Sequence, residues 1–232
     1  MIKKIIISII LAGFLYACES SKNKKNLVKN YTCFCENDSL INHSTVSCDT
    51  TMLSNKSKLY WQFNCDRIWL TLENINKQKT IIDSLSIDFY PLTYRIGYHL
   101  IKEFDKTILF RNNCPATSGN CNFTLIDKFN GEKVKEFDHL ICIETDDNIY
   151  KLDFIVYLSE TKEQLIIYYV NSGKILKIPF NENLTFTVST KEQFEEMSLK
   201  NNILELTYWS YDNSKKKISI NLNDEKYSYL QP

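Results

Sequence analysis

The chain has 232 residues, of which 44% are hydrophobic and 13% aromatic, and its 28 basic and 28 acidic residues give a formal net charge of zero. This composition excludes an intrinsically disordered chain and is sufficient for one sizeable hydrophobic core. It also lacks the strong positive charge on which nucleic-acid binding depends, so we expect no nucleic-acid partner.

The N-terminal segment has the pattern of a secretory signal peptide. Lys3 and Lys4 give it a positive start, and an apolar run of thirteen residues extends from Ile5 to Ala17. A membrane-spanning helix needs about 20 apolar residues, so this run is too short to remain as an anchor. The pattern predicts that residues 1–17 are a signal peptide that is removed after export.

The residues at the end of this segment, Leu15-Tyr16-Ala17-Cys18, resemble the lipobox of bacterial lipoproteins. The match departs from the family pattern at Tyr16, where a small residue is preferred, and it covers these four residues alone. The resemblance implies that Cys18 becomes the first mature residue and carries a diacylglyceryl group and usually a further acyl chain, such as palmitate. It implies a bacterial envelope protein held by lipid. In lipoproteins exported to the outer surface, the residues just after the lipidated Cys tend to be acidic, and here Glu19 is the one acidic residue among residues 19–30. The resemblance therefore favours the outer membrane facing the periplasm, with surface exposure as the alternative.

We predict that residues 18–30 form a lipidated flexible tether, because they are mostly polar and have no apolar period. We predict that residues 31–232 form a single domain, because no Pro-, Gly- or Ser-rich linker divides them. The sequence of this domain does not place it in a characterised family.

Seven cysteines remain after Cys18, and export favours disulfides among them. We expect Cys114 to pair with Cys121 across a turn-rich loop, and we expect Cys142 to be a buried free thiol. The other four would form two bridges, whose connectivity the sequence leaves open among three arrangements: Cys33, Cys35, Cys48 and Cys65. A zinc site on these four is the less favoured reading, because a one-residue gap is shorter than the usual ligand spacing. We therefore expect no metal and no cofactor.

The mature domain predicts an all-β fold. Leu59, Trp61 and Phe63 alternate with polar neighbours, as in a half-buried strand. Four similar strand–turn–strand segments recur about 40–50 residues apart, which is the spacing of propeller blades: residues 70–81, 123–134, 165–176 and 206–218. Antiparallel hairpin repeats in a small or incomplete propeller-like architecture are thus the first prediction, and a β-sandwich or barrel is the alternative.

One short helix is predicted near residues 190–199. Thr190 and Gln193 fit a capping box, and Phe194 and Met197 would share a helix face. This helix would lie over the sheets as a plug or lid.

No catalytic set is predicted. The three histidines, His43, His99 and His139, form no metal-binding or catalytic motif. The domain is instead rich in aromatic residues on or near strands, which could bind a partner or simply pack in the core; the candidates are Trp69, Trp209, Tyr98, Tyr169 and Tyr211.

The function that follows is a membrane-anchored, non-enzymatic binding module for an envelope protein or a glycan. The alternatives are an immunity-type inhibitor lipoprotein, and an envelope hydrolase with His99 or His139 as base and Asp or Glu partners.

Overall fold

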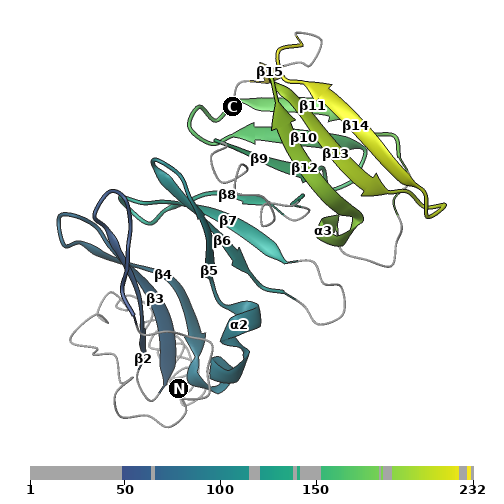
Figure 1. The fold of residues 1–232 in the computed structure, drawn as a ribbon. Helices are drawn as coiled ribbons and strands as arrows, with labels where there is room; N and C mark the ends of the chain where they lie inside the picture. Colours follow the sequence, from purple (N-terminus) through teal and green to yellow (C-terminus); the bar gives the residue numbers. More distant parts are fainter. Residues whose placement is uncertain are drawn as a thin grey trace, which may run out of the picture. The chain divides into compact units, whose positions relative to one another are not determined.

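A computed structural model describes residues 49–63, 66–114, 121–137, 140–141, 153–182, 184, 190–224 and 229–230. The protein is all-β, as predicted, and the antiparallel strands of these described residues form four sheets (Figure 1). The predicted signal peptide and tether lie outside the described residues. No helix in the described part of the chain is long and apolar enough to cross a membrane.

The first two sheets are four-stranded meanders in chain order. The first contains β1 (Thr51–Met52), β2 (Lys58–Phe63), β3 (Arg67–Glu73) and β4 (Lys79–Ser86). A 3-10 helix, η2 (Ile87–Leu92), and a one-turn helix, α2 (Thr93–Ile96), lead to the second sheet. That sheet contains β5 (His99–Glu103), β6 (Thr107–Asn112), β7 (Asn122–Asp127) and β8 (Lys133–Phe137).

The last two sheets are formed by the C-terminal part of the chain. The third contains β9 (Phe154–Leu158), β10 (Gln164–Tyr169) and β11 (Ile175–Pro179), and β15 (Tyr229–Leu230) pairs with the outer side of β11. The fourth follows helix α3 (Thr190–Gln193) and contains β12 (Phe194–Lys200), β13 (Ile203–Trp209) and β14 (Lys215–Asn221).

The repeated segments of the sequence are the hairpins that end each meander. They correspond to β3–β4, β7–β8, β10–β11 and β13–β14, one in each sheet. Gly131 and Gly173 occupy two of the turns with φ of +75° and +71°, a conformation that side chains with a Cβ rarely adopt. The described strands therefore form four separate sheets and no closed barrel, with one of the four repeated hairpins in each sheet.

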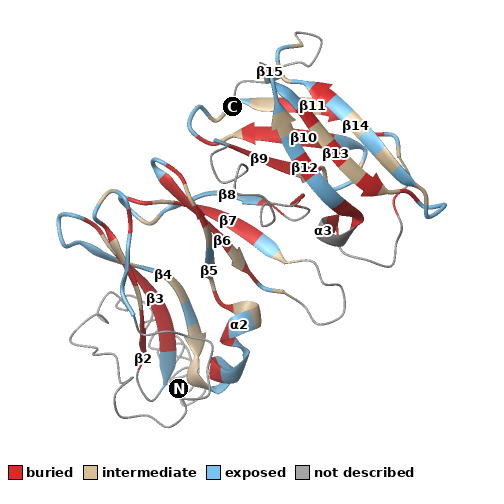
Figure 2. Ribbon diagram, viewed as in Figure 1, coloured by how far each residue is buried: buried red, intermediate tan, exposed pale blue. Residues whose placement is uncertain are grey.

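Buried residues lie on strands of all four sheets (Figure 2), and three apolar clusters each contain residues of two successive sheets. In β6, Ile108 and Phe110 join the core shared with the first sheet, whereas Leu109 joins the core shared with the third. Because successive side chains of a strand point to opposite faces, the two inner sheets bury apolar residues on both sides. A third core joins the third and fourth sheets, so each sheet shares a core with the next.

The predicted helix near residues 190–199 is only four residues long, and Phe194–Lys200 is strand β12. The helical spacing of Phe194 and Met197 misled the prediction. A bulge lies between Phe194 and Glu196, and it shifts the alternation so that residues three apart both point into the core. The segment thus forms part of a sheet and is not a lid over one.

Candidate functional site

A pocket of about 170 Å³ lies between the first and second sheets. We call it the His99 pocket, and its lining is Asp49, Thr51, Leu59, Tyr60, Trp61, Leu70, Tyr98, His99, Leu100 and Phe110. A cavity of about 150 Å³ holds a benzene-sized ligand, so the pocket has room for one ring or one branched side chain. It contains two candidates singled out from the sequence, Tyr98 and His99.

The floor of the His99 pocket is apolar. Leu59, Trp61, Leu70 and Phe110 are buried, and the Tyr98 ring packs against Phe110 with centroids 5.6 Å apart. These residues come from β2, β3, β6 and the residue just before β5, so the floor exists only where the two sheets meet. An apolar floor with few polar groups is typical of ligand pockets.

Gly97 permits this arrangement. A Cβ at this position would lie 2.8 Å from the Thr93 carbonyl oxygen and 3.3 Å from the Trp61 ring. The first of these distances is shorter than real Cβ contacts, so a side chain here would displace the end of α2 from the pocket wall.

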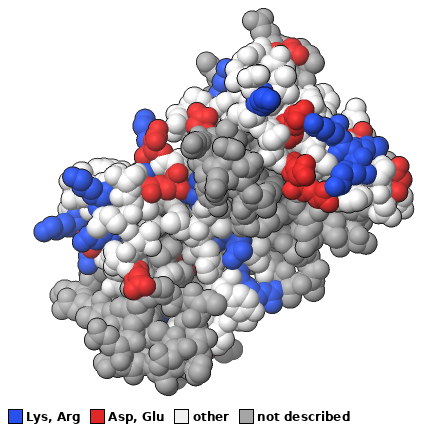
Figure 3. Space-filling model, in the orientation of Figure 1, with Lys and Arg blue, Asp and Glu red and all other residues white. Residues whose placement is uncertain are grey.

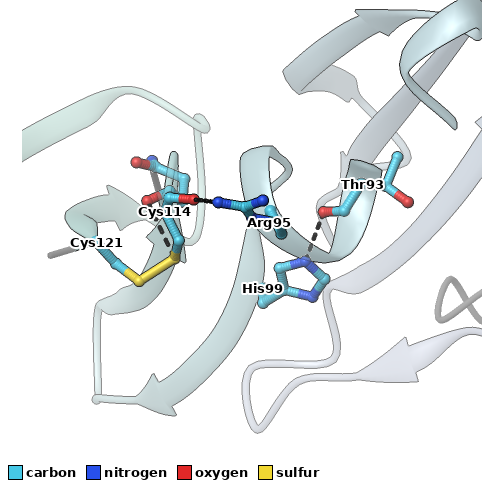
Figure 4. The surroundings of a disulfide bond; sticks show 6 residues. Thr93, Arg95, His99, Cys114 and Cys121 are labelled. Carbon is cyan, nitrogen blue, oxygen red and sulfur yellow. Dashed lines mark hydrogen bonds between the residues drawn. A yellow bond between two sulfur atoms is a disulfide. The ribbon is translucent and has the colours of Figure 1, made fainter. Parts of the chain in front are cut away.

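His99 forms one wall and is fixed by helix α2. Its Nε2 lies 2.8 Å from the Thr93 carbonyl oxygen, which can only accept, so Nε2 carries the proton (Figure 4). Burial and the nearby Arg111 guanidinium lower the pKa of His99 and outweigh the opposing hydrogen bond to Thr93. The ring is therefore neutral near pH 7, and its Nδ1 is a hydrogen-bond acceptor.

Helix α2 is in turn tied to a disulfide-bonded hairpin loop. Cys114 and Cys121 form a disulfide at the ends of β6 and β7 (Figure 4). The Cys114 N–H donates to the Arg95 carbonyl oxygen at 2.7 Å, and Arg95 Nη2 donates to the Cys114 carbonyl oxygen at 3.3 Å. The disulfide loop and the wall of the His99 pocket are thus connected through one helical turn.

The polar rim of the pocket is rich in acceptors. Asp49 contributes a carboxylate, and Tyr60 donates its hydroxyl to Glu73 Oε2 at 2.9 Å. Burial and that hydrogen bond raise the pKa of Tyr60, so it stays protonated. Together with His99 Nδ1, these groups suit a ligand that brings hydrogen-bond donors above an apolar group.

The structure places the other aromatic candidates on different sheets. Trp69 on β3 is only 4% exposed and donates from Nε1 to Gln62 at 3.2 Å. Tyr169 on β10 packs against Phe154. Trp209 and Tyr211 lie at the end of β13, where Tyr211 is 64% exposed. The candidates do not form one patch, and only Tyr98 belongs to the His99 pocket.

Several predicted residues lie outside the described part of the chain. They are Cys18, Cys33, Cys35, Cys48, Cys65, Cys142, His43 and His139. Among the described residues, no group of three His, Cys, Asp or Glu side chains could hold a metal ion.

Sequence reasoning missed most of the His99 pocket. Leu59 and Trp61 were visible as one face of a strand, but nothing local indicated that Asp49 and Tyr60 would meet Tyr98 and His99. The pocket depends on how two sheets pack, and such contacts leave no short motif.

No protein-family model matches the chain, and none of the curated proteins matches it. The candidate site therefore has to be interpreted from its own geometry.

Proposed function

We propose that the protein is a lipid-anchored binding module of the bacterial envelope that holds a protein partner by one apolar side chain in the His99 pocket. The observation that carries the proposal is the pocket itself, with its buried aromatic and aliphatic floor and its acceptor-bearing rim. The lipobox resemblance at Cys18 supplies the membrane anchor.

The size of the pocket favours a macromolecular partner over a free small molecule. Burying one apolar side chain contributes about 1.5–3 kcal/mol, whereas micromolar binding requires about 8 kcal/mol. The pocket alone would therefore hold a free ligand weakly. A protein partner would make further contacts around the side chain in the pocket, as in interfaces where a central buried side chain is surrounded by weaker contacts.

Binding also agrees with the role of His99. Its described interactions are the hydrogen bond to Thr93 and the charge of Arg111. A hydrolase would use a carboxylate to orient this imidazole, whereas here a backbone carbonyl does so. We therefore propose that His99 is a fixed part of the pocket wall and a hydrogen-bond acceptor for the partner.

Site-specific photo-crosslinking in intact cells tests the proposal. A photoreactive phenylalanine analogue replaces Leu100 at the pocket rim or, as a control, Ile203 on the fourth sheet; the two residues are 40% and 41% exposed. We expect one discrete protein adduct from position 100 and none of that mass from position 203. A second copy of the protein without the photoreactive residue can compete for this partner and so reduce the yield of the adduct. A second copy that carries Leu100→Trp should leave the yield unchanged, whereas one that carries Ile203→Trp should reduce it. No adduct at position 100, or the same adduct from both positions, would overturn the proposal.

A further inference from the structure

A second and larger pocket, of about 370 Å³, lies beside the third sheet. Its lining comes from the β9–β10 turn and from the segment after β11: Thr161, Lys162, Glu163, Phe180, Asn181, Glu182 and Leu184. The Phe180 N–H donates to the Glu163 carbonyl oxygen at 2.7 Å, which holds the two segments together. We call this the Asn181 pocket, and its volume lies within the range of about 300–1,000 Å³ seen for small-ligand sites.

The base of the Asn181 pocket is apolar and buried. Phe180 is 2% exposed, and its ring centroid lies 5.3 Å from Tyr208 and 6.1 Å from Phe194. Leu184 is also buried and is bridged to Ser210 in the backbone. These contacts join the pocket base to the third core, so the base is pre-formed.

The walls of the pocket are polar, and hydrogen bonds orient their carboxylate side chains. Glu182 Oε2 accepts from Lys216 Nζ at 2.8 Å, and the Tyr208 hydroxyl also bonds to this carboxylate. Glu163 Oε2 accepts from the Thr161 hydroxyl at 3.3 Å. A carboxylate has about four acceptor positions, so these bonds orient each group while leaving capacity for a ligand.

The charges around the pocket are balanced. Lys162 and Lys216 offset Glu163 and Glu182. On the neighbouring strand β14, Lys215 and Lys217 likewise pair with Glu195 and Glu205, and Figure 3 shows Lys or Arg side chains next to acidic ones on the surface. Neither an anion nor a cation is therefore strongly favoured. The Asn181 amide adds donors and acceptors in one plane.

We propose that the Asn181 pocket binds a saccharide. A sugar ring presents hydroxyls that both donate and accept, which matches the oriented carboxylates, the amide and the Thr161 hydroxyl. Its C–H face matches the apolar base of Phe180 and Leu184, and its neutrality matches the balanced charges. This inference is independent of the proposed function, because it concerns a different pocket and a different class of ligand.

The test is an NMR titration of the full chain purified in detergent, with glucose, N-acetylglucosamine, maltose and cellobiose as probes. At least one probe should shift the amide signals of Thr161–Glu163 and Asn181. Asn181→Ala and Glu163→Gln should each weaken its binding about tenfold, as expected for the loss of hydrogen bonds. Asn130→Ala and Glu132→Gln are matched controls, since these two residues are bonded to each other in the exposed β7–β8 turn.

The controls should leave sugar binding unchanged. The proposal is overturned if no probe shifts these signals, or if binding survives Asn181→Ala and Glu163→Gln. Neither result would bear on photo-crosslinking at Leu100, so failure here is distinguishable from failure of the proposed function.

Discussion

The Lys128 ammonium lies 2.6 Å from the Glu103 carboxylate, and the Lys128 side chain is only 1% exposed. Ser54 joins the same carboxylate oxygen through its N–H at 2.7 Å and its hydroxyl at 2.6 Å. These contacts fasten the β1–β2 turn to the second sheet. Burial opposes ionisation of Glu103, but the hydrogen bonds from Lys128 and Ser54 outweigh it and lower its pKa.

Glu103→Gln is expected to lower the free energy of unfolding by about 2 kcal/mol, because it leaves the buried Lys128 charge without a counter-ion. The loss should be below the ~3–5 kcal/mol of a fully buried pair, since Glu103 itself is 28% exposed. Urea unfolding at pH 7 measures it. The wild-type contribution should disappear as the pH falls below about 4.3, where the unfolded carboxylate binds its proton.

Glu136→Gln is the matched control, because Lys133 and Glu136 form a similar pair at 2.8 Å with both side chains more than half exposed. Exposed pairs contribute little, so this change should cost less than about 0.5 kcal/mol. Equal losses for the two substitutions would contradict a special role for the buried pair.

Lys102 on β5 carries a charge that burial makes unfavourable. The residue is 5% exposed, and burial lowers its pKa to about 8 although the charge of Asp153 opposes the shift. Lys102→Met should therefore raise stability at pH 7. The folded protein releases the proton near pH 8 and the unfolded chain near pH 10.4, so wild-type stability rises across this interval and the advantage of the variant shrinks.

Urea unfolding at pH 7 and pH 10 measures this effect, with exposed Lys133→Met as the control that should change stability by less than about 0.5 kcal/mol. An advantage of Lys102→Met that is constant over this interval would show that packing, and not charge burial, explains it.

The Cys114–Cys121 disulfide should stabilise the fold modestly. The bridge closes a short loop, with a sequence separation of 7, so its removal by double substitution to Ser should cost about 2–3 kcal/mol. Because Cys114 is bonded to Arg95, the NMR signals of His99 should shift in the same variant. A stability equal to that of the wild type, measured without reductant, would count against the bridge.

His99 should titrate below the ordinary value of about 6.5, as burial lowers its pKa. Imidazole nitrogen NMR should show the Nε2–H tautomer at neutral pH. The unfolded chain then binds a proton more readily than the folded one, so this residue should reduce stability as the pH falls below about 6.5. A pKa above 6.5, or the Nδ1–H tautomer, would refute this description of the pocket wall.

Cys18→Ser should move the protein from the membrane to the soluble fraction. Each buried CH₂ of an acyl chain contributes about 0.8 kcal/mol, and two or three chains anchor stably where one does not. Membrane fractionation with metabolic labelling by radioactive palmitate measures both effects. Cys142→Ser is the control, and it should remain in the membrane fraction. Unchanged fractionation of Cys18→Ser would contradict lipidation at this residue.

Local signals were sufficient to predict the hairpins. Alternation in segments such as residues 70–81 and 165–176 sets the strand faces, and turn residues such as Gly131 set the reversals. Both signals act between residues close in sequence. The same reasoning failed at Phe194 and Met197, because a bulge gives a strand the spacing expected of a helix.

The sequence by itself determined the all-β class and the four repeated hairpins, because each depends on short-range patterns; lipidation at Cys18 stays a prediction from the sequence. Tertiary structure alone decided that Trp69 is buried and that Tyr98 and His99 line a pocket with Asp49. The physical reason is that alternation tells which residues share a face of a strand but not which sheet covers that face. Packing between sheets joins residues far apart in the chain, and there the candidate sites are formed.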